Sequence, residues 1–146
     1  MANLNRFIFI NCPFDSEYRP LFEAIVFAIY ACGFVPRCSL EDGDSGRLRL
    51  LKIIDLIDQC AYGVHDISRT ELDANTQLPR FNMPFELGLA LGRKHTSDGR
   101  PRLLIFDREA YRYQKFLSDL AGCDPCSHNC SPIEAIIAIR DWLLRE

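Results

Sequence analysis

Short apolar runs alternate along this chain with longer segments whose apolar residues recur at helical spacing. The apolar runs lie at residues 6–11, 34–40, 61–67 and 102–107, and the helical segments at 20–32, 47–59, 83–92, 109–120 and 132–145. Strands that alternate with helices of this length form right-handed βαβ units, in which helices cover both faces of a parallel sheet. The alternation therefore predicts an α/β fold with a parallel sheet of four or five strands.

The number of strands favours a flavodoxin-like three-layer sandwich with the strand order 2-1-3-4-5. The run at 34–40 contains Pro36, which has no backbone N–H, so we expect this strand at or near a sheet edge. A fifth short strand is expected between Ala121 and Ser131. At 146 residues, the chain is interpreted as one domain covering residues 1–146.

Composition and charge argue against several classes of protein. Seventeen Lys and Arg residues against 20 Asp and Glu residues give a net charge of −3, so no basic face for duplex nucleic acid or an anionic membrane is expected. The longest apolar run, 21–36, is shorter than the roughly 20 residues of a membrane span. The N-terminal apolar block, 7–10, is too short for a signal peptide. We expect a cytoplasmic protein whose seven cysteines are free thiols.

Polar residues gather where this fold places its ligands. With the order 2-1-3-4-5, the topological switch point lies between the first and third strands, and ligands bind beyond their carboxyl ends. Candidate binding residues follow the first strand, follow the third strand, or open the next helix: Asn11, Cys12, Pro13, Phe14, Asp15, Ser68, Arg69, Asn82 and Met83. The sequence therefore predicts a small-molecule site at this edge of the sheet.

Two carboxylates, Asp66 and Glu86, are the candidate catalytic residues. Paired carboxylates suit a reaction that needs a nucleophile or charge stabiliser together with an acid or base. Each also has a purely structural interpretation: Asp66 as a cap of the turn that follows its strand, and Glu86 as an acid that complements a helix dipole. His65 points to the opposite face of the strand from Asp66, and we interpret it as a packed core histidine.

Several alternative sites lack the residues they need. A phospho-acceptor receiver domain needs an acidic pair after the first strand, where this chain has Asn11 and Cys12. Glycine loops of the Walker or dinucleotide type are absent. Residues 123–130 (CDPCSHNC) resemble a metal site, but the four potential ligands are too closely spaced, so a loop whose His128 reaches the crevice is favoured.

The segments 63–69, 82–95 and 101–107 resemble the superfamily that joins nucleoside 2-deoxyribosyltransferases, nucleotide N-glycosidases and TIR-like domains. In that group the third strand typically ends in an Asp followed by a small polar residue. The next helix opens with an aromatic-Glu-x-Gly-x-Ala pattern, which residues 85–90 (FELGLA) match. The resemblance covers roughly residues 6 to 107. The turn after the first strand differs from the GP-type turn of typical deoxyribosyltransferases.

The resemblance implies an enzyme that cleaves the N-glycosidic bond of a nucleoside, nucleotide or NAD. Glu86 would match the glutamate that attacks or stabilises C1′, and Asp66 the acid that contacts the sugar or the base. We expect no metal, no cofactor and at least a dimer, and Arg37, Arg69 or Arg80 as the residue that holds a phosphate. The alternatives are a non-catalytic TIR-like module, for nucleotide binding or protein interaction, and a purely structural subunit.

Overall fold

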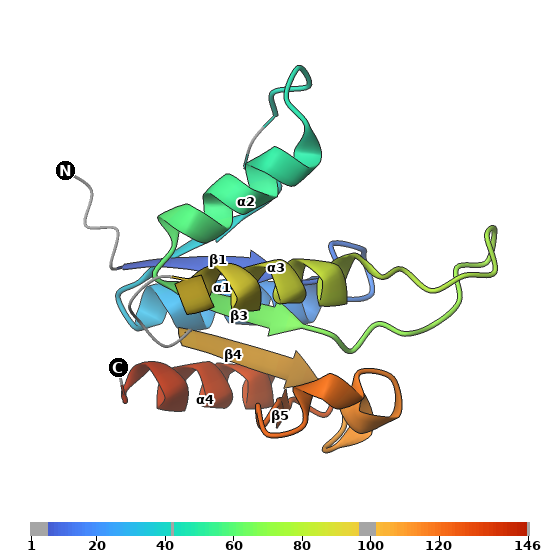
Figure 1. Ribbon diagram of the computed structural model, residues 1–146. Coiled ribbons are helices and arrows are strands. Elements are labelled where there is room, and N and C mark those ends of the chain that lie inside the picture. Colours follow the sequence, from blue (N-terminus) through green and yellow to red (C-terminus); the bar gives the residue numbers. More distant parts are fainter. Residues whose placement is uncertain (1–5, 42, 97–101, 146) are drawn as a thin grey trace.

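A parallel sheet lies between two layers of helices in the computed structural model, which describes residues 6–41, 43–96 and 102–145 (Figure 1). The strands are β1 (Phe7–Asn11), β2 (Val35–Cys38), β3 (Tyr62–Asp66), β4 (Arg102–Asp107) and β5 (Cys126–Ser127), and the α-helices are α1 (Arg19–Ala31), α2 (Arg49–Gln59), α3 (Asn82–Thr96) and α4 (Pro132–Leu143). The five strands are ordered β2-β1-β3-β4-β5, and every neighbouring pair is parallel. The predicted flavodoxin-like topology is thus confirmed, with Pro36 in an edge strand.

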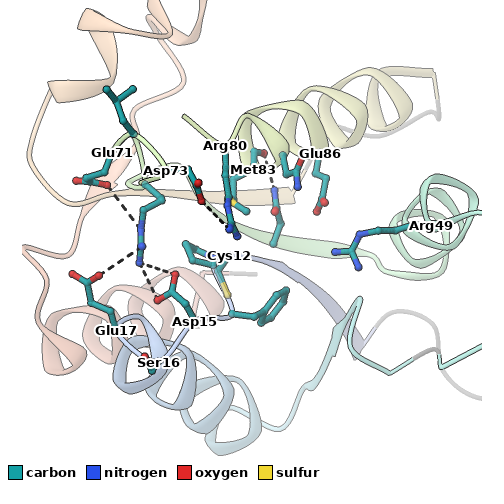
Figure 2. Close-up of a pocket in the computed structure, with 16 residues that line it drawn as sticks. Cys12, Asp15, Ser16, Glu17, Arg49, Glu71, Asp73, Arg80, Met83 and Glu86 are labelled. Atoms are coloured by element: carbon teal, nitrogen blue, oxygen red, sulfur yellow. Dashed lines mark hydrogen bonds and ion pairs between the residues drawn. The ribbon is translucent and has the colours of Figure 1, made fainter. Parts of the chain in front are cut away.

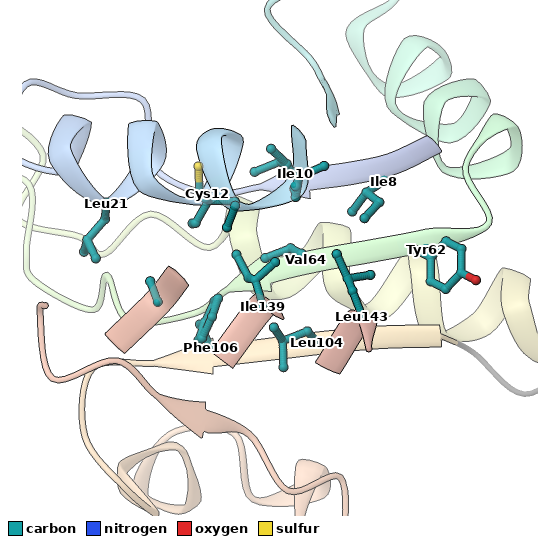
Figure 3. Close-up of a cluster of buried hydrophobic side chains, with 14 of the residues drawn as sticks. Ile8, Ile10, Cys12, Leu21, Tyr62, Val64, Leu104, Phe106, Ile139 and Leu143 are labelled. Carbon is teal, nitrogen blue, oxygen red and sulfur yellow. The ribbon is translucent and has the colours of Figure 1, made fainter. Parts of the chain in front are cut away.

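The two faces of the sheet have separate hydrophobic cores. One core packs α1 and α4 against alternate residues of β1, β3 and β4, including Ile8, Val64 and Phe106 (Figure 3). The other packs α2 and α3 against the opposite face, where Phe9 meets Ile57. Because successive strand residues point to opposite faces, these apolar strands are buried on both sides. None of the described helices is long and apolar enough to cross a membrane.

The predicted helix at 109–120 is wrong. The structure has two short 3-10 helices there, η2 (Arg112–Lys115) and η3 (Ser118–Leu120). Tyr111 adopts a left-handed conformation with φ of 59°, which interrupts a right-handed helix. The guanidinium of Arg112 also donates to Asp107 at the end of β4 and to the backbone carbonyl of Ser68. This anchor ties the segment to the strand ends.

The long loop between β3 and α3 folds back on itself and projects from the body of the protein (Figure 1). Leu72 and Pro79 form an isolated antiparallel bridge across it. Asp73 closes the turn, since its side chain accepts hydrogen bonds from the backbone of Asn75 and Thr76. This polar segment therefore has its own ordered turn.

Gly63 in β3 is predicted to tolerate no larger residue. A Cβ at this position would lie 2.8 Å from both His65 Nε2 and Leu103 Cδ2. We expect Gly63→Ala to lower the free energy of unfolding by about 1–3 kcal/mol through overpacking, measured by urea denaturation. The matched control is Gly88→Ala, because a Cβ at Gly88 has nothing within 4 Å. Equal stability of the two variants would contradict the prediction.

Candidate functional site

A pocket of about 540 Å³ opens beyond the carboxyl ends of β1 and β3 (Figure 2). Its lining comes from the turn after β1, the start of α2, the loop after β3 and the start of α3. The lining residues are Asn11, Cys12, Pro13, Phe14, Asp15, Ser16, Glu17, Arg49, Arg69, Glu71, Leu72, Asp73, Arg80, Asn82, Met83 and Glu86. This volume lies within the range of small-molecule sites.

Nine of the eleven site residues predicted from the sequence line this pocket. Asp66 and Ser68 are not among the lining residues; both are buried, and Asp66 is 0% exposed. The two predicted catalytic carboxylates therefore do not face each other across the pocket. Glu86 lies at its surface, and Asp66 lies within the protein.

Glu86 is a buried carboxylate, 7% exposed, that borders the pocket. Burial raises the pKa of Glu86 to about 7, although the nearby positive charge of Arg49 opposes the shift. No described residue donates a hydrogen bond to this carboxylate. Glu86 is the fifth residue of α3, and the first turn of that helix has no acidic residue. The helix-dipole interpretation thus loses its support, and the carboxylate is left facing the pocket.

Asn11 at the end of β1 holds the start of α3 in place. Its side-chain amide donates to the Met83 carbonyl at 2.9 Å and contacts His65 Nδ1 at 3.0 Å. His65 is fully buried, as predicted for a core histidine, and burial lowers its pKa to about 3. Asn11 therefore joins two strands to the helix that carries Glu86.

Asp66 sits at the centre of a buried polar network. One carboxylate oxygen accepts from the Ser68 hydroxyl and from the Ser68 backbone N–H, the latter at 2.7 Å. The other accepts from the hydroxyl of Tyr18 and lies 2.9 Å from His128 Nε2. Burial, together with the charge of Asp66, raises the pKa of Tyr18, which keeps the phenol protonated as a donor. The network joins the N-cap of α1, the end of β3 and the segment after β5.

The tautomer of His128 follows from its two hydrogen bonds. The backbone N–H of Cys130 donates to Nδ1 at 2.9 Å, so Nδ1 must be the unprotonated nitrogen. Nε2 then carries the proton and donates to Asp66. His128 is thus buried against Asp66 rather than in the pocket lining. Cys123, Cys126 and Cys130 are exposed, and the described residues contain no group of three or more potential metal ligands.

Two of the arginines considered for phosphate binding are already paired with carboxylates in the pocket. Arg69 lies 3.0 Å from Asp15, and Arg80 lies 3.2 Å from Asp73. The third, Arg37, lies outside the pocket lining, where it pairs with Glu41 and stacks over the Phe7 ring.

Six lining residues were not predicted for any role in the site. They are Ser16 and Glu17 after β1, Arg49 on α2, and Glu71, Leu72 and Asp73 in the loop before α3. Arg80, from the same loop, was among the three arginines predicted for phosphate binding. A polar loop directly after β3 was a usable signal for the last group. Arg49 had no such signal, because it lies at the start of a helix that follows the edge strand.

Two solved structures share this architecture. The TIR domains of the activated Roq1 resistosome, which directly recognises the pathogen effector XopQ, align over 97% of this chain and 86% of that chain, with 11% identity and a TM-score of 0.54. A diflavin flavoprotein A3 from Nostoc sp. aligns over 99% of this chain and 96% of that chain, with 16% identity and a TM-score of 0.52. No protein-family model and no curated protein matches the sequence.

At these identities the similarity establishes the fold alone, because one fold hosts many functions. The TIR-like part of the resemblance is supported at the level of the fold. The deoxyribosyltransferase part stays a prediction.

Proposed function

We propose that this protein cleaves the N-glycosidic bond of a nucleoside, nucleotide or NAD, with Glu86 as its catalytic residue. The supporting observation is the state of Glu86, a buried carboxylate without a hydrogen-bond donor among the described residues, which borders a pocket of about 540 Å³. Cleavage of this bond develops positive charge at C1′, which an adjacent carboxylate stabilises. Burial strengthens that attraction because it excludes water.

The proposed reaction proceeds in two steps. In the first, a Glu86 oxygen bonds to C1′ while the C1′–N bond breaks and its electron pair leaves with the base. Nicotinamide leaves NAD as a neutral molecule, whereas other bases take up a proton from solvent. In the second step, water bonds to C1′, the ester bond breaks, and the surplus proton of the water goes to solvent. A second base in place of water gives transfer instead of hydrolysis.

Asp66 is proposed as a positioning residue rather than as a group that touches the substrate. Its four hydrogen bonds hold Tyr18, Ser68 and His128 beneath the pocket. Asp15 caps the adjoining turn, since its side chain accepts from the Tyr18 backbone N–H at 3.0 Å, and it also lines the pocket. Asp66 thus acts on the pocket through the start of α1.

The proposal is tested by incubating the purified protein with NAD, NADP, nucleoside monophosphates and deoxynucleosides and separating the products by HPLC. We expect one class to release its free base, and Glu86→Gln to abolish the release. The matched control is Glu23→Gln, which removes an exposed carboxylate of α1 that pairs with Arg19. Base release that survives in Glu86→Gln would contradict the proposed role of Glu86.

The same screen separates the enzyme from a non-catalytic module. No release of base from any substrate, together with a ligand-induced rise in melting temperature that Glu86→Gln shares, would favour a nucleotide-binding TIR-like module. Loss of the enzyme proposal would then leave the fold assignment unchanged.

We also propose that the protein forms at least a dimer. The Roq1 TIR domains were determined within an assembly, a resistosome. Exposed apolar side chains lie on α1 (Phe27, Tyr30) and on the adjacent α4 (Ile133, Ile137). Multi-angle light scattering is expected to give a mass of at least twice 16.8 kDa. A monomer at every concentration would contradict this expectation.

A further inference from the structure

Arg49, the first residue of α2, reaches toward Glu86 at the edge of the pocket (Figure 2). Within residues 6–41, 43–96 and 102–145, its hydrogen-bond partner is Ser39 Oγ, at 3.3 Å, and no carboxylate lies within ion-pair distance of its guanidinium. The other two pocket arginines differ in this respect, since Arg69 pairs with Asp15 and Arg80 with Asp73. Among the described residues, Arg49 is therefore the pocket arginine without a carboxylate partner, and its charge can act on a ligand.

A second observation comes from Glu86, which is more than nine-tenths buried, faces the same pocket and has no hydrogen-bond donor in the described part of the chain. The charge of Arg49 acts on this carboxylate, yet the two side chains form no salt bridge. A cation and a carboxylate thus border one cavity without being joined to each other.

The charges of the pocket are unevenly distributed. Asp15, Glu17 and Glu71 surround Arg69 at 3.0, 3.7 and 3.9 Å, on the side opposite Arg49 (Figure 2). An anionic group there would be repelled by the carboxylates or would have to displace them from Arg69. At the Arg49 end, the carboxylate among the described lining residues is Glu86, and its raised pKa of about 7 keeps a substantial part of it neutral near pH 7. The anionic part of a ligand is therefore directed toward Arg49.

We propose that Arg49 binds a phosphate group of the substrate, so that the pocket selects nucleotides over nucleosides. This inference rests on the proposed function and names its substrate class. The planar guanidinium offers paired N–H donors that match two phosphate oxygens. Ser39 holds the guanidinium from one side and leaves its remaining donors for the ligand. The phosphate would then lie at α2 while the glycosidic carbon lies at Glu86.

The test compares the binding of adenosine, AMP and ADP-ribose by isothermal titration calorimetry, which needs no turnover. Arg49→Gln is expected to weaken the binding of AMP and of ADP-ribose by about tenfold or more, as for the loss of a charged hydrogen bond. The binding of adenosine is expected to weaken by less than about twofold. The matched control is Arg47→Gln, because Arg47 pairs with Asp55 outside the pocket lining. AMP and ADP-ribose together distinguish a phosphate monoester from a diphosphate.

The calorimetry has outcomes that overturn the inference and an outcome that supports it. Equal weakening of adenosine and AMP in Arg49→Gln, unchanged AMP and ADP-ribose binding, or no binding of either by the wild type would each overturn the inference. Phosphate-dependent binding that is lost in Arg49→Gln, without base release by the wild type, would support Arg49 as an anchor and remove only the enzyme proposal.

Discussion

Glu86→Gln is expected to reduce base release by the protein at least a thousandfold. Glutamine keeps the shape of the side chain but supplies neither a nucleophile nor a negative charge to an oxocarbenium-like centre. Loss of such a group typically costs about 10²–10³-fold for electrostatic stabilisation alone, and more when a covalent intermediate is also lost. The rate is measured by HPLC at saturating substrate. A residual rate above about 0.1% of the wild-type rate would contradict a nucleophilic role.

The same variant is expected to gain stability relative to the wild type as the pH rises. Burial raises the pKa of Glu86 to about 7 from its usual 4.5, so the folded protein binds this proton more tightly than the unfolded chain. Stability from this group is therefore full below pH 4.5 and is lost as the pH rises through 7. Between pH 5 and 8 the loss is about 2–3 kcal/mol in the wild type. The glutamine side chain of the variant does not titrate, so this part of the pH dependence disappears.

Melting temperatures at pH 5 and pH 8 check this expectation. The difference between Glu86→Gln and the wild type is expected to grow by several degrees toward pH 8. Glu23→Gln serves as the control, because Glu23 is exposed on α1 and pairs with Arg19. A parallel pH dependence in the wild type and Glu86→Gln would show that Glu86 titrates normally. If Glu86→Gln loses base release but gains stability, the loss of activity is not caused by unfolding.

Asp66→Asn is expected to lower the free energy of unfolding by about 3 kcal/mol or more. The aspartate accepts from two fixed donors, the Ser68 backbone N–H on one oxygen and His128 Nε2–H on the other. Whichever way the asparagine amide is turned, its own N–H groups meet one of these donors. His128 cannot reverse its tautomer, because Nδ1 accepts from the Cys130 backbone. A buried donor is therefore left without an acceptor.

Urea denaturation measures this effect, with a melting temperature lowered by roughly 10 °C as its thermal counterpart. The matched control is Asp141→Asn on α4, whose side chain is 43% exposed and pairs with the neighbouring Arg140. We expect that control to change stability by less than about 0.5 kcal/mol. If Asp66→Asn changed the free energy of unfolding as little as Asp141→Asn does, the network would not stabilise the fold. The rate of base release by Asp66→Asn, measured below its melting temperature, reports whether Asp66 also positions the pocket residues, apart from its effect on stability.

Much of the pocket could be predicted because parallel α/β folds place ligands by topology. The alternation of strands and helices predicted the order of the strands, and the order predicted that the turns after β1 and β3 adjoin one pocket. Asn11, Asp15 and Arg69 line it for that reason. The position of Glu86 could be predicted from the same rule, because the loop after β3 leads to the start of α3 at that edge of the sheet.

The position of Asp66 could not be predicted in the same way. It ends its strand at the predicted edge, but Tyr18 at the N-cap of α1 and His128 from the segment after β5 contact it within the protein. These partners lie 48 and 62 residues away in the sequence. Arg112 is a similar case, because its bonds to Asp107 and Ser68 accompany two short turns where apolar spacing predicted a helix.

Local pattern thus determined the fold class, the sheet order and most of the pocket lining, because these follow from periodicity and from the geometry of parallel strands. Only the tertiary structure decided which charged groups stay unpaired. Arg69 and Arg80 meet carboxylates, whereas Arg49 and Glu86 border the cavity and form no salt bridge with any described residue. The charge available to a ligand depends on which side chains folding brings together. The spacing of residues along the sequence does not determine the distances between those side chains.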